Sequence, residues 1–97
     1  MPEGATVLQR RELGMIARYC VNRIDEMLGP PDSWFLRVGA AEEGQFACTV
    51  VVHDRGCAIE TTSTEPDGAL AIWDAMREVE TVLRDVRASR FRWRRAA

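Results

Sequence analysis

The side chains best suited to metal or redox chemistry in this 97-residue chain are Cys48, His53 and Cys57. Thiolate and imidazole groups of this kind bind zinc when they converge on one ion. These three residues fall on two strand-like runs, residues 45–53 and 57–64, separated by a short turn signal at residues 54–56. Whether they converge therefore depends on how the two runs pair.

The expected hairpin pairing separates these ligands. If Ile59 shares the inner face with Val52, the paired residue numbers sum to about 111, which sets Cys48 opposite Ser63 and turns it inward. The same register places His53 opposite Ala58 and turns it outward, because successive strand residues face opposite sides of a sheet. Cys48 and Cys57 also lie too far apart along the ladder for a disulfide bond. We therefore expect no metal site, no cofactor and reduced thiols.

Catalytic groups are equally sparse. His53, the single histidine, lies beside Asp54 and near Cys57, but no third group is placed to orient a nucleophile and its base. The acidic pair Glu42-Glu43 lies in a predicted turn, and no glycine-rich phosphate loop joins a strand to a helix. We predict that the protein is not an enzyme.

Arginine is the most suggestive residue type near the C-terminal end. All 13 basic residues are arginine, and six of them lie between Arg84 and Arg95, although the net charge of the chain is −2. The planar guanidinium fork suits phosphate, and an interleaved aromatic ring can stack on an unpaired base. The residues predicted to contact RNA are Arg84, Arg87, Arg90, Arg92, Trp93, Arg94 and Arg95, with Arg11 and Arg18 as secondary candidates.

Two amphipathic helices flank the strand-like runs. Apolar residues recur at helical spacing over residues 10–28, and Gly29-Pro30-Pro31 then gives a strong stop signal. A second helix is expected to begin near residues 64–67, with Thr64 or Asp67 as its N-cap, and to end near Ala88. Its apolar stripe is predicted to comprise Leu70, Trp73, Met76, Val79, Leu83 and Val86.

Three runs between the helices alternate in polarity, as strands do. They cover residues 33–40, 45–53 and 57–64, with turn signals at residues 42–44 and 54–56. Their short connections favour antiparallel hairpins over parallel crossovers.

These elements predict one α+β domain over residues 10–88, in the order (β)-α-β-β-β-α. The sheet is expected to be antiparallel with three or four strands, and both helices to pack on its one apolar face. Residues 1–9 are expected to form a tail or a short edge strand around residues 5–8, and residues 89–97 an arginine-rich C-terminal tail. No run is long and apolar enough for a membrane span, and the N-terminus lacks the features of a secretory signal, so we expect a cytoplasmic protein.

The α-β-β-β-α order is similar to that of the double-stranded-RNA-binding domain. That family carries a basic cluster at the start of its last helix, where this chain has the residues Pro66-Asp67-Gly68-Ala69-Leu70-Ala71. We therefore expect a shared topology at most.

Residues 10–88 more closely resemble the ribosome hibernation promoting factor family, also called the sigma-54 modulation or light-repressed protein family. The resemblance rests on the first helix, the spacing of the three strands, and the run from Ala58-Ile59-Glu60-Thr61 through Asp67 into Leu70-Ala71-Ile72-Trp73-Asp74. It departs from the family in lacking lysines and in the acidic residues Glu78, Glu80 and Asp85 on the last helix.

The resemblance implies a non-enzymatic domain that binds the small ribosomal subunit or another structured RNA. The alternative is a protein-interaction or homodimerisation module that uses a sheet edge or the outer sheet face. Phe35 and Val51 are expected to lie exposed on that face beside Thr49 and Thr62.

Overall fold

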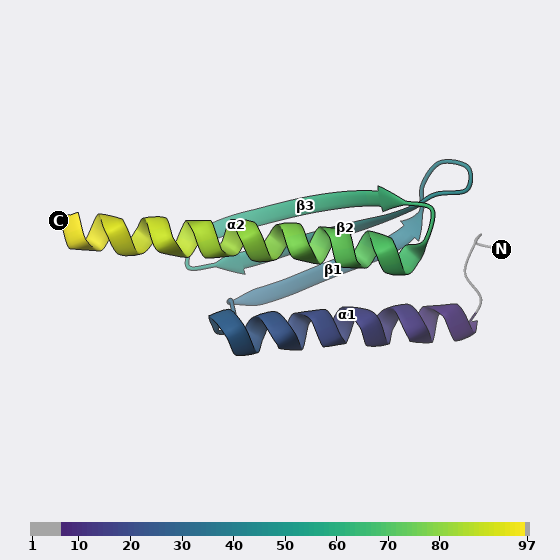
Figure 1. Ribbon diagram of the computed structural model, residues 1–97, viewed down its shortest axis with the longest axis horizontal. Helices are drawn as coiled ribbons and strands as arrows, with labels where there is room; N and C mark the ends of the chain where they lie inside the picture. Colours follow the sequence, from purple (N-terminus) through teal and green to yellow (C-terminus); the bar gives the residue numbers. More distant parts are fainter. Residues whose placement is uncertain (1–6, 97) are drawn as a thin grey trace.

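The computed structural model describes the backbone of residues 7–96 and the side chains of residues 10–89. Along the chain, one helix precedes the three strands and a second helix follows them (Figure 1). The elements are α1 (Val7–Leu28), β1 (Ser33–Ala40), β2 (Phe46–Asp54), β3 (Cys57–Glu65) and α2 (Gly68–Ala96). The predicted α+β class and its element order are confirmed. No helix in this described part is long and apolar enough to cross a membrane.

Helix α1 begins three residues before the predicted start and ends at the predicted stop. Val7 and Leu8 belong to the helix, so they do not form the suggested edge strand, and Ala5 and Thr6 lie outside the described residues. Gly29 has a φ of 85° and donates its N–H to the Asp25 carbonyl at 2.9 Å. A left-handed residue directly after the helix closes its last turn, which is the usual role of glycine at that position.

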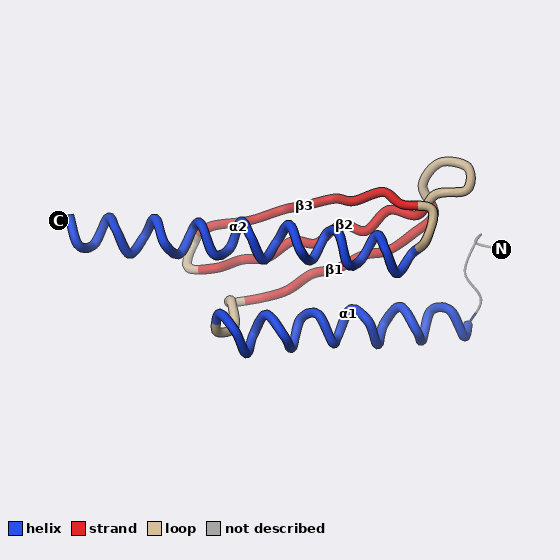
Figure 2. The backbone as a smooth tube through the Cα atoms, in the orientation of Figure 1, coloured by secondary structure: helices blue, strands red, loops and turns tan. Residues whose placement is uncertain are grey.

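The three strands form an antiparallel sheet in the order β1-β2-β3 (Figure 2). Val52 pairs with Ile59, Cys48 with Ser63 and His53 with Ala58, as the sequence predicts. The β2–β3 turn has positive φ at both Arg55 (53°) and Gly56 (83°), the geometry of a two-residue hairpin turn. The register is therefore fixed at both its turn and its apolar face.

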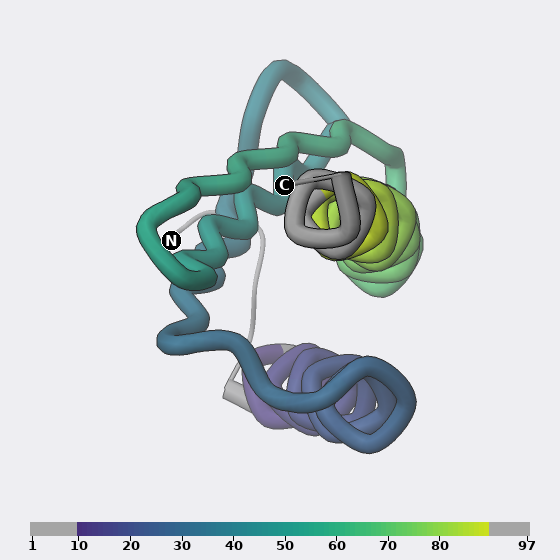
Figure 3. The backbone as a smooth tube through the Cα atoms, turned by 90° about the vertical axis from the view of Figure 1, so that its left-hand side faces the viewer, coloured from purple at the N-terminus to yellow at the C-terminus, as the bar shows by residue number. Residues whose placement is uncertain are grey.

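Both helices lie on one face of the sheet, and no element of residues 7–96 covers the other face (Figure 3). Helix α2 covers β2 and β3, and α1 lies beside α2 on the side of β1 (Figure 1). The buried core between these layers contains Cys20, Ile24, Cys48, Val50, Val52, Ile59, Ala71, Ile72, Ala75, Met76, Val79 and Leu83. Thr61 joins this core because its hydroxyl donates to the Ala75 carbonyl at 3.1 Å.

The buried face of α2 is rotated from the predicted stripe. Ala71, Ile72 and Ala75 are fully buried, whereas Leu70 and Trp73 are 49% and 39% exposed. The small alanines allow α2 to approach the sheet closely, so the buried face centres on them and moves Leu70 and Trp73 to its margin.

Helix α2 is longer than predicted. Asp67 is its N-cap, accepting the Ala69 N–H at 2.8 Å, whereas Thr64 remains in β3. The helix continues through Ala96, so residues 89–96 are helical and not a tail. The reason is local, because no glycine or proline interrupts residues 69–96 and arginine and alanine are good helix formers.

Candidate nucleic-acid interface

The side chain of Arg87 is fixed inside the fold. Its Nε and Nη2 donate to the two carboxylate oxygens of Asp54 at 3.2 and 3.1 Å, and its Nη1 donates to the Leu28 carbonyl. Arg87 is 24% exposed and Asp54 is 2% exposed. All three guanidinium nitrogens thus donate within the protein, and these contacts give Arg87 a structural role.

Arg87 consequently marks the end of the packed domain. It joins the last residue of β2 and the last residue of α1 to α2 at a single point. The 29 residues of α2 span about 43 Å, whereas a nine-residue strand such as β3 spans roughly 30 Å. The end of α2 therefore projects past the sheet and past α1 (Figure 1). We call this projecting segment, residues 88–96, the C-terminal arm.

The C-terminal arm carries most of the predicted RNA-contact residues. Arg90, Arg92, Trp93, Arg94 and Arg95 lie on its helical backbone, and their side chains fall outside the described residues. In sequence, the arm contains four arginines and no acidic residue. A helix with this composition presents a concentrated positive charge away from the body of the domain.

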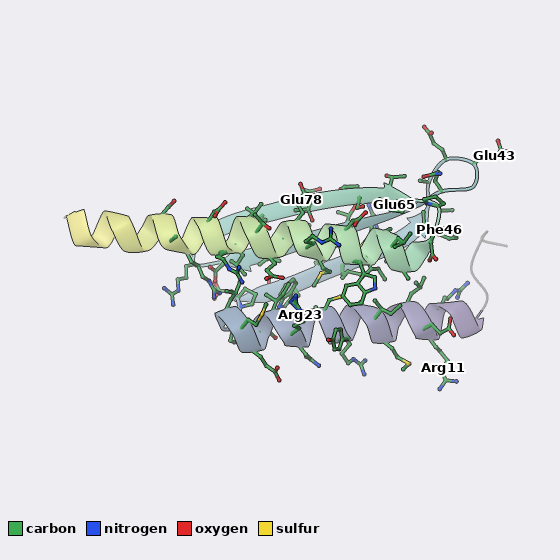
Figure 4. The ribbon with its side chains drawn as sticks, in the orientation of Figure 1. Arg11, Arg23, Glu43, Phe46, Glu65 and Glu78 are labelled. Atoms are coloured by element: carbon green, nitrogen blue, oxygen red, sulfur yellow. The ribbon has the colours of Figure 1, made fainter. Side chains whose placement is uncertain are left out.

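Arg84 lies three residues before Arg87, in the packed part of α2, and is paired with Glu80. Its Nη2 lies 3.0 Å from Glu80 Oε2, and its side chain is 57% exposed. Arg23 of α1 approaches the other Glu80 oxygen at 3.2 Å, and Figure 4 shows Arg23 between the two helices. Glu80 therefore links α1 to α2 and offsets part of the positive charge there.

The secondary candidates Arg11 and Arg18 lie elsewhere. Both are exposed on α1, seven residues apart and hence on one face of that helix. Figure 4 shows Arg11 pointing away from α2. The fold does not bring this pair together with the arm, so they would form a separate contact.

The cysteine and histidine side chains are dispersed, as their strand positions predict. Cys48 is fully buried on the inner sheet face, His53 is exposed on the outer face, and Cys57 is half-buried beside the turn. Among the described residues, no group of three or more His, Cys, Asp or Glu side chains is placed to hold a metal ion.

The outer sheet face has the expected residues. Phe35 is 55% exposed opposite the half-buried Val51, and the hydroxyls of Thr49 and Thr62 lie 3.2 Å apart. No described element covers this face (Figure 3). A self-association or protein-binding role for it stays a prediction.

Sequence reasoning missed a groove between the two helices. Its lining includes Arg23, Ile24, Trp73, Met76, Arg77 and Glu80, and its volume is about 210 Å³. Trp73 and Tyr19 contact each other at its rim, with ring centroids 5.9 Å apart and an interplanar angle of 65°. The exposed side of an amphipathic helix pair gives little local signal for such a site, because the groove exists only once α1 and α2 are packed together.

The chain matched no protein family, no curated protein and no solved structure in comparisons with known proteins.

Proposed function

We propose that this protein is a non-enzymatic RNA-binding domain, with the C-terminal arm as its main contact. The observation that carries this proposal is the projection of a basic helix beyond the Arg87–Asp54 contact. RNA of the small ribosomal subunit is the candidate partner that the family resemblance suggests.

Charge segregation supports an anionic partner for the arm. Between Arg84 and Arg95 the chain has six of its 13 arginines and only one of its 15 acidic residues, Asp85. The rest of the chain has seven arginines and 14 acidic residues, so its net charge is negative. Binding would therefore concentrate at the arm, where arginine forks can pair with phosphates.

The fold sharpens the set of contact residues. Arg87 leaves the set, since its guanidinium is held by Asp54 and the Leu28 carbonyl. Arg84 is retained with part of its charge offset by Glu80. The arm residues Arg90, Arg92, Arg94 and Arg95 supply the phosphate contacts, and Trp93 is the candidate for stacking on a base.

The test is a binding titration with a labelled small-subunit rRNA helix at about 50 mM salt, where phosphate contacts are strongest. Replacing Arg90, Arg92, Arg94 and Arg95 by glutamine retains a good helix former while removing four charges. We expect the variant to bind on the order of 100-fold more weakly than the wild type.

The matched control removes exposed arginines from the body of the domain. Arg37→Gln with Arg55→Gln changes charge on the outer sheet face and the β2–β3 turn, and should leave the RNA affinity within about twofold. Absence of RNA binding and of ribosome co-sedimentation by the wild type at this salt concentration contradicts the proposed function. Equal losses in the arm variant and the control contradict the assignment to the arm.

A further inference from the structure

The groove between α1 and α2 combines an apolar interior with a positively charged rim. Ile24 and Met76 are 2% exposed at its base, and Trp73 stands at its side, 39% exposed. Cys20 also lines the base, and burial raises the pKa of its thiol, which keeps that surface uncharged near neutral pH. A flat, largely apolar group can therefore enter with little loss of hydration.

The charge around the groove favours an anion. Arg23 and Arg84 both pair with the single carboxylate of Glu80, so two positive charges share one negative charge. Arg77 lines the same groove and makes no side-chain hydrogen bond or ion pair with any described residue. Glu78, the acidic neighbour of Arg77, is directed away from α1, toward the β3 side of α2 (Figure 4). Three arginines therefore lie at or beside the groove with one carboxylate, that of Glu80, paired to two of them, which favours an anion.

The size and position of the groove limit the kind of ligand that it can bind. A volume of about 210 Å³ suits one planar heterocycle. Arg77 and Arg84 recur two turns apart on the same side of α2, leading from the groove toward the arm. From Arg77 to Arg90 the helix rises about 20 Å, so a short RNA can reach both places.

We propose that this groove binds one unpaired nucleotide of the RNA, with the base against Trp73 and its phosphate on Arg77. The inference rests on the proposed RNA-binding function and assigns to it a preference for RNA with an extruded base. Tyr19 contacts the Trp73 ring edge to face, which restrains the indole that the base would meet.

The experiment compares two labelled RNA duplexes that differ only by a one-nucleotide bulge. Wild-type protein should bind the bulged duplex about tenfold more tightly, as expected for one base stacked on an aromatic side chain. Trp73→Leu and Arg77→Gln should each reduce that ratio to about one and leave the affinity for the perfect duplex nearly unchanged. Arg77→Gln affects an exposed side chain, so it also serves if Trp73→Leu disturbs folding.

Two substitutions on the opposite side of the molecule are matched controls. Phe35→Leu removes an exposed aromatic ring and Arg37→Gln removes an exposed charge, both on the outer sheet face. Both should keep the tenfold preference. Equal binding of the two duplexes by the wild type, or a preference that survives Trp73→Leu and Arg77→Gln, overturns the groove assignment while RNA binding through the arm stands. Failure of the wild type to bind either duplex removes both proposals.

Discussion

Arg87 and Asp54 form a two-point ion pair at the junction of three elements. Two guanidinium nitrogens meet the two carboxylate oxygens at 3.1 and 3.2 Å, and the third donates to the carbonyl that ends α1. Asp54 is 2% exposed, so its charge depends on partners within the protein for compensation. This contact gives Arg87 a structural role that distinguishes it from the four arginines of the C-terminal arm.

Replacing Arg87 by glutamine should destabilise the domain strongly. The substitution leaves a buried carboxylate without its cationic partner and the Leu28 carbonyl without this donor. Breaking one side of such a pair costs about 3–5 kcal/mol. Urea denaturation followed by far-UV circular dichroism measures the loss in the free energy of unfolding.

Arg84→Gln is the matched control for this measurement. It removes the same charge three residues earlier on α2, from a pair whose arginine is 57% exposed. An exposed pair of this kind contributes less than about 1 kcal/mol. Similar losses for the Arg84 and Arg87 variants would show that the Asp54 contact has no special structural role.

The arm should give RNA binding a steep dependence on salt. Each phosphate neutralised by an arginine contributes roughly 0.7 to 0.9 to the slope of log affinity against log salt concentration. Replacing Arg90, Arg92, Arg94 and Arg95 by glutamine should therefore reduce the slope by about three. Titrations from about 50 to 200 mM salt measure it, and an unchanged slope with weaker binding would point to lost helix structure instead of lost phosphate contacts.

Much of the fold could be predicted because its signals are local. Gly29 ends α1 where the sequence indicates, and the apolar positions Val52 and Ile59 fix the register of the β2–β3 hairpin. The predicted end of α2 near Ala88 is wrong, because a change to basic composition does not by itself end a helix. An uninterrupted run of helix formers instead allows the helix to continue through Ala96.

The candidate site was less predictable because it depends on packing between distant segments. Arg87 is one of six clustered arginines in the sequence, and only the folded chain brings it to Asp54, 33 residues earlier. Trp73 belongs to an apolar stripe by spacing alone. Its exposure follows from the close approach of α2 to the sheet at Ala71 and Ala75, which no local pattern specifies.

The carboxyl groups of Glu65 and Asp74 should make stability depend on pH. The hydrogen bond with Asp74 raises the pKa of Glu65, and burial and repulsion between the two carboxyl groups act in the same direction. The folded state therefore holds a proton more tightly than the unfolded chain does. Protonated Glu65 therefore contributes fully to the stability of the folded state below the pKa that Glu65 has in the unfolded chain. This contribution is lost as the pH rises through the pKa of Glu65 in the folded state.

Glu65→Gln keeps a hydrogen-bonding side chain and removes the repulsion. The variant should be more stable than the wild type near pH 7, and this advantage should shrink as the pH falls through the acidic range. Glu60→Gln, on the exposed face of the same strand, is the control for removing a negative charge. Melting temperatures from pH 3.5 to 7 give the comparison, and a pH-independent difference for Glu65→Gln would contradict a raised pKa of Glu65.

The three thiols should differ in reactivity according to their positions in the fold. Burial raises the pKa of Cys48 to about 11, with the nearby Cys20 thiol adding to the effect, and burial likewise raises the pKa of Cys20. The thiolate is the reacting form, so both residues should resist iodoacetamide at pH 8 until the domain opens.

Cys57 is half-buried beside the turn and should alkylate first. Mass spectrometry of timed samples should show one fast modification in the wild type and none in Cys57→Ser. Fast labelling at Cys48 would contradict the packing of β2 against the helices, whereas labelling of Cys57 much faster than free cysteine would support an activated thiol at the turn.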